Sequence, residues 1–325
     1  MIRITAQTYS HSVRCILVIA TCLCSIVALG QESQTVYNFL RLPASAHAAA
    51  LGGDAIALTD DDGSLLFHNP ALIQNVTDRS LTLGMMTYME GSVVANADYV
   101  WTSGQRGTWA VDGRFINYGS MKETDPTGLQ TGTFSARDVA LGAAYSYGLF
   151  GNLSGGISAK LIGSYIGSYN SVGAAVDIGI NYFNPTSQWS LSAVVRNLGG
   201  QLSAYEDDFE RLPLDVQLGV SKRLTGSPLR FTASLVRLND WQYGIGHHLQ
   251  VGADLLLGEQ FYIAAGYNSM RAREMKIASG DGESSHGAAL SFGCGLMLER
   301  LKLHVTYARY HVSTASLLVN FSYCL

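Results

Sequence analysis

The sequence predicts an all-β fold, a 14-stranded antiparallel transmembrane β-barrel with a small N-terminal plug segment. Three observations lead to this prediction. Segments of strand length alternate apolar with small or polar residues, aromatic residues gather near the segment ends, and the connections are alternately short and long. Barrels that cross a membrane with strands have these features.

Residues 1–30 are expected to be a secretion signal. Arg3 and Arg14 supply a basic start, a short apolar run follows, and small residues before Gln31 suit cleavage. The run is too short to span a membrane as a helix, and no later stretch reaches the roughly 20 apolar residues that a span needs. A lipid anchor at Cys22 or Cys24 is a less favoured interpretation, because the apolar run continues past both.

Residues 31–77 differ from the rest and are expected to form the plug segment. Residues 37–51 predict a short helix that ends at Gly52 and Gly53, and residues 65–69 predict a second short helix or turn before Pro70. A segment of this length cannot form a domain alone. We therefore expect it to fold into or across the periplasmic mouth of the barrel.

Residues 78–325 are expected to form the barrel. The segments have the length of a tilted membrane strand, and their even number suits a bacterial single-chain barrel. The last segment alternates in type and needs a partner strand, because an unpaired apolar edge would aggregate. The expected strands are 79–90, 92–102, 107–118, 136–148, 153–164, 171–182, 188–197, 213–223, 229–238, 247–257, 260–268, 287–298, 301–311 and 315–325.

The lengths of the connections predict how the barrel is oriented. With both termini in the periplasm, the even connections face the periplasm and are short, as outer-membrane barrels require. The odd connections face outward and include the three longest, 119–135, 198–212 and 269–286. The expected location is therefore the cell outer membrane.

A soluble β-sandwich is the alternative fold, since it also has alternating strands and glycine-containing turns. A sandwich normally carries charge on the face opposite the apolar one. Here that face is rich in glycine, alanine and serine. The aromatic residues near the strand ends also favour the membrane barrel, whose two interfaces carry aromatic girdles; they are Tyr88, Trp101, Trp109, Tyr145, Tyr147, Tyr182, Trp189, Tyr262, Tyr267 and Tyr307.

Ten charged residues are expected to face the lumen. Acidic and basic members are nearly balanced, which favours a network of paired charges between strands, because unpaired charges in a narrow lumen are costly. A polar permeation path is the functional alternative. The ten are Asp98, Asp112, Arg114, Asp138, Lys160, Asp177, Arg196, Asp215, Asp254 and Lys302.

Few residues suggest catalysis or metal binding, and no cofactor is expected. Asp60, Asp61 and Asp62 could bind calcium, although their spacing matches no EF-hand and a solvated acidic turn is the favoured interpretation. His304 is expected in the lumen near Lys302 and Thr306, and His247 and His248 at a strand mouth. Because these candidates show no recognisable catalytic spacing, a barrel hydrolase is a distant alternative. His47 and His68 are expected on the polar surface.

Two of the long outer connections are strongly charged and are candidate binding surfaces. Loops on a rigid scaffold often carry binding function, and charge there gives specificity. Solvated loops without a partner are the alternative interpretation. The candidate partner residues are Glu206, Asp207, Asp208, Arg211, Arg271, Arg273 and Lys276.

The N-terminal region carries a run of motifs that resembles a known family. The run comprises Tyr37-Asn38-Phe39-Leu40-Arg41-Leu42-Pro43-Ala44-Ser45-Ala46, Ala48-Ala49-Ala50-Leu51-Gly52-Gly53, Asp60-Asp61-Asp62 and His68-Asn69-Pro70-Ala71-Leu72. It is similar to PorQ-like and PorV-like proteins of the type IX secretion system of Bacteroidota. More remotely it resembles FadL-type outer-membrane barrels, which share the element Asn69, Pro70, Ala71 before the first strand.

The resemblance implies a role that is not enzymatic. PorQ-like proteins anchor a surface protein, PorZ, in the attachment complex that processes secreted cargo, and by this resemblance the long outer loops would form the partner surface. The FadL-type branch implies the alternative, which is transport of hydrophobic compounds through the lumen and past the plug. The resemblance also implies fourteen strands and an N-terminal plug.

Overall fold

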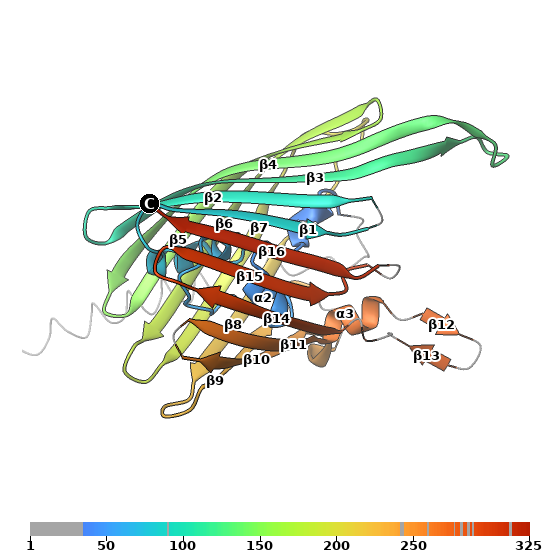
Figure 1. Cartoon of the computed structure of the whole chain (residues 1–325). Helices are drawn as coiled ribbons and strands as arrows, with labels where there is room; N and C mark the ends of the chain where they lie inside the picture. Colours follow the sequence, from blue (N-terminus) through green and yellow to red (C-terminus); the bar gives the residue numbers. More distant parts are fainter. Residues whose placement is uncertain are drawn as a thin grey trace, which may run out of the picture.

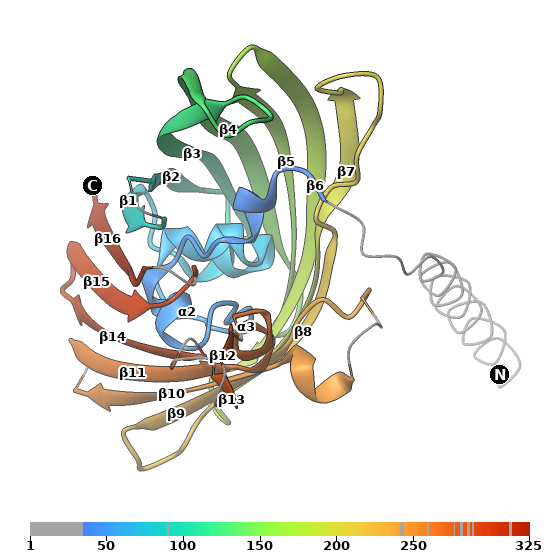
Figure 2. The same cartoon turned by 90° about the vertical axis from the view of Figure 1, so that its right-hand side faces the viewer.

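The chain folds into one closed barrel around its own N-terminal segment (Figures 1 and 2). The structure is a computed structural model that describes residues 35–325 apart from 90, 241–243, 259, 276, 280–281, 285–286, 288 and 312–313, and for 277–279 and 282–284 it describes the backbone alone. The expected secretion signal, residues 1–30, lies outside the described residues.

Fourteen antiparallel strands close the wall, as the alternation of the sequence predicted. The circle closes between the first and last of them, with Ser80 opposite Cys324 and Met86 opposite Leu318. The wall consists of β1 (Ser80–Thr87), β2 (Val93–Ser103), β3 (Gly107–Thr124), β4 (Gln130–Phe150), β5 (Leu153–Ile166), β6 (Tyr169–Asn184), β7 (Trp189–Ser203), β8 (Asp215–Arg223), β9 (Leu229–Leu235), β10 (Leu249–Leu257), β11 (Phe261–Asn268), β14 (Leu290–Met297), β15 (Leu301–Ala308) and β16 (Ser316–Cys324).

The outer face of the wall is an apolar band that can lie against membrane lipid. Large apolar side chains such as Leu161 and Leu191 are exposed on the side away from the lumen. No helix within the described ranges is long and apolar enough to cross a membrane. Girdle residues such as Trp109 and Trp189 are exposed near strand ends. The prediction was wrong for Tyr262, whose ring is buried in the lumen.

The long outer connections contain more regular structure than the sequence indicated. β3 and β4 continue into the expected loop 119–135 and leave a five-residue turn at its tip, so this hairpin projects beyond the rest of the wall (Figure 1). β7 likewise runs on to Ser203. The connection 269–286 contains the helix α3 (Ser269–Glu274) and a small hairpin of β12 (Ile277–Ser279) and β13 (Gly282–Ser284).

The N-terminal segment lies inside the barrel as a chain of short helices. These are η1 (Asn38–Arg41), α2 (Ala46–Ala50), η2 (Gly63–Phe67) and η3 (Pro70–Asn75). The prediction of one helix over residues 37–51 was wrong, because Pro43 interrupts it. Proline lacks an N–H donor and restricts the residue before it to extended conformations. Ser45 starts α2 instead, with its side chain accepting a hydrogen bond from the Ala48 amide.

The segment fills the lumen over its height and is not confined to the periplasmic mouth. Near the outer end, Phe39 and Leu40 pack with wall residues such as Ile116. Toward the end that carries the C-terminus, Leu58 and Leu65 pack with Tyr262 in a second cluster. A third cluster joins Leu66, Ile73 and Val76 to Val100 and Ala110. Short turns and the C-terminus share this end, which we therefore assign to the periplasm.

Glycines of the wall make room for the segment. A Cβ atom added at Gly266 would lie 2.3 Å from the backbone nitrogen of Gly52, and one at Gly156 would lie 2.4 Å from that of Ala71. Such distances are far inside van der Waals contact, so main chain meets main chain at both places. The glycine-rich inner face seen in the sequence thus has a structural cause.

We predict that Gly266→Ala destabilises the docked N-terminal segment. The added methyl group would force the backbone of residues 51–52 away from the wall, and overpacking of this kind costs about 1–3 kcal/mol. The free energy of unfolding in urea, measured in detergent micelles, is the readout. Gly200→Ala is the matched control, because a Cβ atom there meets nothing within 4 Å. Equal stability of the two variants would contradict the tight docking.

Candidate functional site

A buried cluster of charges joins α2 and the acidic turn to the wall. His47 lies between two carboxylates, with Nδ1 3.0 Å from Asp60 Oδ2 and Nε2 2.8 Å from Asp254 Oδ1. Arg230 contacts the same two carboxylates, at 2.5 Å from Asp60 and 2.7 Å from Asp254. The His47 ring also stacks on Tyr262, with centroids 3.7 Å apart. Two plug residues and two wall residues thus form one closed set of ion pairs.

The protonation state of His47 depends on this cluster. Burial alone would lower the pKa of His47, but the carboxylates of Asp254 and Asp60 outweigh it and raise the pKa to about 9. Burial likewise opposes ionisation of Asp60, yet Arg230 and His47 hold the pKa of that carboxyl well below its usual range. At neutral pH the cluster therefore contains two positive and two negative groups.

A second set of contacts holds the segment to β7. The Arg196 guanidinium lies 2.7 Å from Asp54 and also donates to the Leu40 carbonyl. His68 Nδ1 lies 3.3 Å from the same Asp54 oxygen, while its Nε2 accepts from the amides of Ala44 and Ser45. Burial lowers the pKa of His68, and Asp54 opposes this only in part. A neutral ring that donates to Asp54 fits these contacts.

Each carboxylate of the acidic turn has partners in the protein, so the turn is not the solvated one that the sequence predicted. Asp60 pairs with the buried cluster, Asp61 lies 2.5 Å from Lys302, and Asp62 accepts from the hydroxyls of Ser45 and Ser64. The three carboxylates thus face three different sets of partners. Within the described ranges, no group of three or more His, Cys, Asp or Glu residues could hold a metal ion. His47 and His68, expected on the surface, are also buried.

The Asn69-Pro70-Ala71 element fastens the last helix of the segment. The Asn69 side chain accepts from the Ala71 amide and so caps η3. Its amide nitrogen donates to the Ile56 carbonyl of the segment and the Ile180 carbonyl of β6. Pro70 occupies the first helical position, where its missing N–H costs nothing. The element therefore connects the segment to the wall.

The ten predicted lumen charges lie on the inner side of the wall, but they pair differently than expected. Lys160 and Asp177, 2.8 Å apart, form the one ion pair within this set among the residues described. Most of the basic members bind the plug segment, and Arg114 donates to the carbonyls of Phe39 and Leu42. Buried members are Asp98, Arg114, Asp138, Asp177, Arg196, Asp215, Asp254 and Lys302, while Asp112 and Lys160 line an interior cavity.

The predicted partner residues fall into two groups. Glu206, Asp207 and Asp208 are exposed in the connection after β7. Arg271 is buried against the segment instead, where it stacks on Tyr310 and donates to the Gly52 and Ala289 carbonyls, so its placement on a binding surface was wrong. Of the remaining members, Arg211 forms a backbone bridge with Thr35, and Arg273 contacts His247. Lys276 lies outside the described residues.

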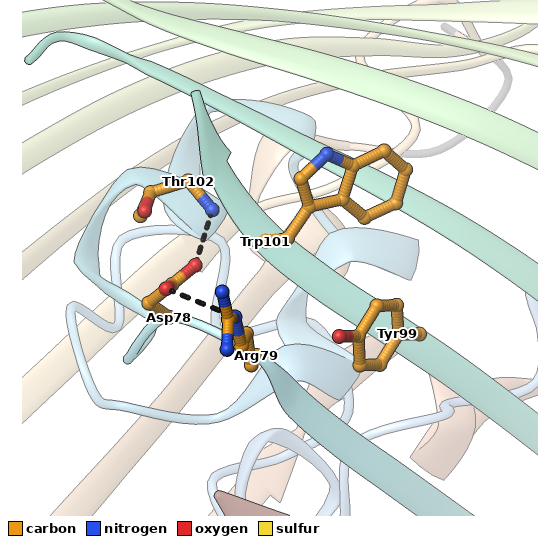
Figure 3. A pocket seen from close by; sticks show the side chains of 5 residues that line it. All are labelled: Asp78, Arg79, Tyr99, Trp101 and Thr102. Carbon is orange, nitrogen blue, oxygen red and sulfur yellow. Dashed lines mark hydrogen bonds and ion pairs between the residues drawn. The ribbon is translucent and has the colours of Figure 1, made fainter. Parts of the chain in front are cut away.

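Two cavities differ in position and character. One of about 20 Å³ lies inside the barrel beside Arg114, Asp112 and Lys160 and has room for about one water molecule. Another, of about 500 Å³, lies at the periplasmic rim, lined by Asp78, Arg79, Tyr99, Trp101 and Thr102 (Figure 3). There Asp78 accepts from the Thr102 amide at 2.7 Å. Neither cavity is an apolar passage through the lumen.

Comparisons with known proteins place the fold. No protein-family model matches the sequence, and no curated protein matches it. The toluene transporter TodX of Pseudomonas putida has a similar structure, with a TM-score of 0.56 and 14% identity over 86% of this chain and 97% of TodX. A FadL homologue of Pseudomonas aeruginosa has a TM-score of 0.55 and 12% identity, over 87% of this chain and 98% of the homologue. The monoaromatic hydrocarbon channel CymD has a TM-score of 0.57 and 11% identity, over 87% of this chain and 97% of CymD. The chain is an outer-membrane β-barrel with a FadL-like fold.

We predict that Asp60→Asn loosens the N-terminal segment. Removal of one partner leaves the buried Arg230 and His47 with a single carboxylate, and breaking a buried pair typically costs about 3–5 kcal/mol. Urea unfolding in detergent micelles measures the loss. Asp78→Asn is the control, because its ion pair with Arg79 is exposed and pairs of that kind contribute about 0–1 kcal/mol. A loss as small as that of the control would refute the structural role of the cluster.

We also predict that docking of α2 weakens at alkaline pH. Because the pKa of His47 is raised on folding, its stabilisation is complete below the ordinary value of 6.5 and is lost as pH rises through about 9. Hydrogen–deuterium exchange of residues 46–50, corrected for intrinsic rates, should therefore accelerate between pH 6.5 and pH 10. Residues 70–75, held by Asn69, serve as the internal control. Equal acceleration of both segments would contradict a specific effect of His47.

Proposed function

We propose that this chain is an outer-membrane scaffold of the type IX secretion system that anchors a surface partner and passes no solute through its lumen. The filled interior supports this most directly. The N-terminal segment packs against the wall at several levels, and pairs such as Arg196–Asp54 and Arg230–Asp60 fasten it. Binding at the outer surface requires no passage, so a permanently closed lumen suits it.

The outer rim offers the surface for such a partner. The β3–β4 hairpin projects from it, and Glu206, Asp207, Asp208 and Phe209 are exposed after β7. Long connections on a rigid scaffold commonly carry binding function. The choice of a PorZ-like protein and other attachment-complex subunits rests on the motif run of residues 37–72 alone.

Transport of hydrophobic compounds is the second candidate, and the structural comparisons favour it. TodX and CymD have this fold and are described as a toluene transporter and a monoaromatic hydrocarbon channel. At 11–14% sequence identity, this likeness shows a shared fold and nothing beyond it. Transport here would require the N-terminal segment to move, because polar contacts occupy its boundary with the wall.

The two functions predict different outcomes for two measurements. If the chain is an anchor, affinity purification from the native outer membrane captures a surface protein, and replacing residues 206–210 by a glycine–serine linker abolishes capture. Replacing residues 225–227 in the periplasmic turn between β8 and β9 is the matched control and should leave capture intact. Uptake of a radiolabelled monoaromatic hydrocarbon into reconstituted vesicles should not exceed that of protein-free vesicles.

Rapid uptake together with no capture of a surface protein would refute anchoring and support the transporter. Loss of uptake after fixing the N-terminal segment to the wall would then identify the route.

A further inference from the structure

The wall has an unpaired edge at the outer end of β7. Pairing between β7 and β8 stops where Arg196 faces Asp215, whereas pairing between β7 and β6 continues to Ser203. Residues 198–203 therefore have a neighbour strand on one side only within the described structure (Figure 2). Alternate residues of such an edge direct their N–H and C=O groups away from the sheet, which makes it a template for another strand.

The surroundings of this edge are both apolar and acidic. Leu198 and Leu202 are 45% and 65% exposed beside it. The connection that follows exposes Glu206, Asp207 and Asp208, and the neighbouring Phe209 is 67% exposed. No lysine or proline, the residues that commonly protect edge strands, lies between 198 and 203.

Main-chain pairing already occurs next to this edge. Thr35 of the N-terminal segment forms a parallel bridge with Arg211, and the Val36 amide donates to the Arg211 carbonyl at 3.0 Å. The connection after β7 is also held to that strand, because the Glu210 amide donates to the Gln201 side chain. This contact holds the acidic connection beside the strand edge at Glu210.

We propose that residues 198–203 of β7 bind an extended, basic peptide segment of a partner protein by strand addition. Main-chain hydrogen bonds would supply the pairing, apolar side chains of the peptide would cover Leu198 and Leu202, and its cationic side chains would face the acidic residues 206–208. The charge of this connection selects a basic occupant over an acidic one. The inference rests on the proposed anchoring function in taking a protein as the occupant.

A synthetic heptapeptide of alternating arginine and valine is the probe, with binding to the full chain in lipid nanodiscs followed by fluorescence anisotropy. An N-methylated version at every residue keeps the charge and lacks all backbone donors. We expect its Kd to be at least tenfold weaker. The combined variant Glu206→Gln, Asp207→Asn and Asp208→Asn should weaken binding of the unmodified peptide by a similar factor.

Leu202→Lys should also weaken binding at least tenfold, because a lysine blocks strand pairing at an edge. Phe150→Lys is the matched control: Phe150 is 70% exposed, similar to Leu202, but ends β4 at the periplasmic turn before β5 and should leave the Kd unchanged. Equal binding of both peptides would overturn the proposal in favour of charge attraction alone. Binding in detergent that disappears in nanodiscs would show that lipid covers the edge, and would overturn it as well.

The outcomes separate this inference from the proposed function. Capture of a surface protein that depends on residues 206–210, without peptide binding, would refute strand addition and leave anchoring intact. Peptide binding to the purified chain without any capture would support the edge and refute anchoring.

Discussion

The structure depends on one constraint: the carboxylates of a segment enclosed in a narrow barrel need cationic partners on the wall. Asp54, Asp60 and Asp61 lie within eight residues of one another and bind Arg196, Arg230 and Lys302, which come from β7, β9 and β15. Strands far apart around the wall thus converge on one short stretch of chain. Because removing one member of such a pair is strongly destabilising, these contacts fix the position of the segment.

The fold could be predicted from the sequence because the signal for a barrel strand is local. Inward and outward residues alternate along each strand, and all fourteen wall strands were found on that basis. The outer parts of β3 and β4 were missed because this alternation is absent there. Beyond the membrane both faces of a strand meet water, so residues 119–135 show no alternation and resemble a loop.

The site could be predicted only in part, because its contacts join residues far apart in the chain. His47 and Asp254 are 207 positions apart, and nothing near His47 in the sequence shows that a wall will enclose it. Arg230 was missed although a signal was present. It shares the inward register of Thr232 and Ser234, opposite the outward Phe231, so stricter use of the alternation would have placed it in the lumen.

The chemistry of the lumen, more than the fold, separates the two proposed functions. A route for apolar compounds needs an apolar lining, because hydrocarbon gains nothing from contact with ion pairs and would separate charges that stabilise one another. Here the boundary between segment and wall holds His47, Arg196, Arg230 and their carboxylates. Displacing the segment would expose each of these groups at once. The cost of that displacement favours a closed barrel that acts through its outer surface.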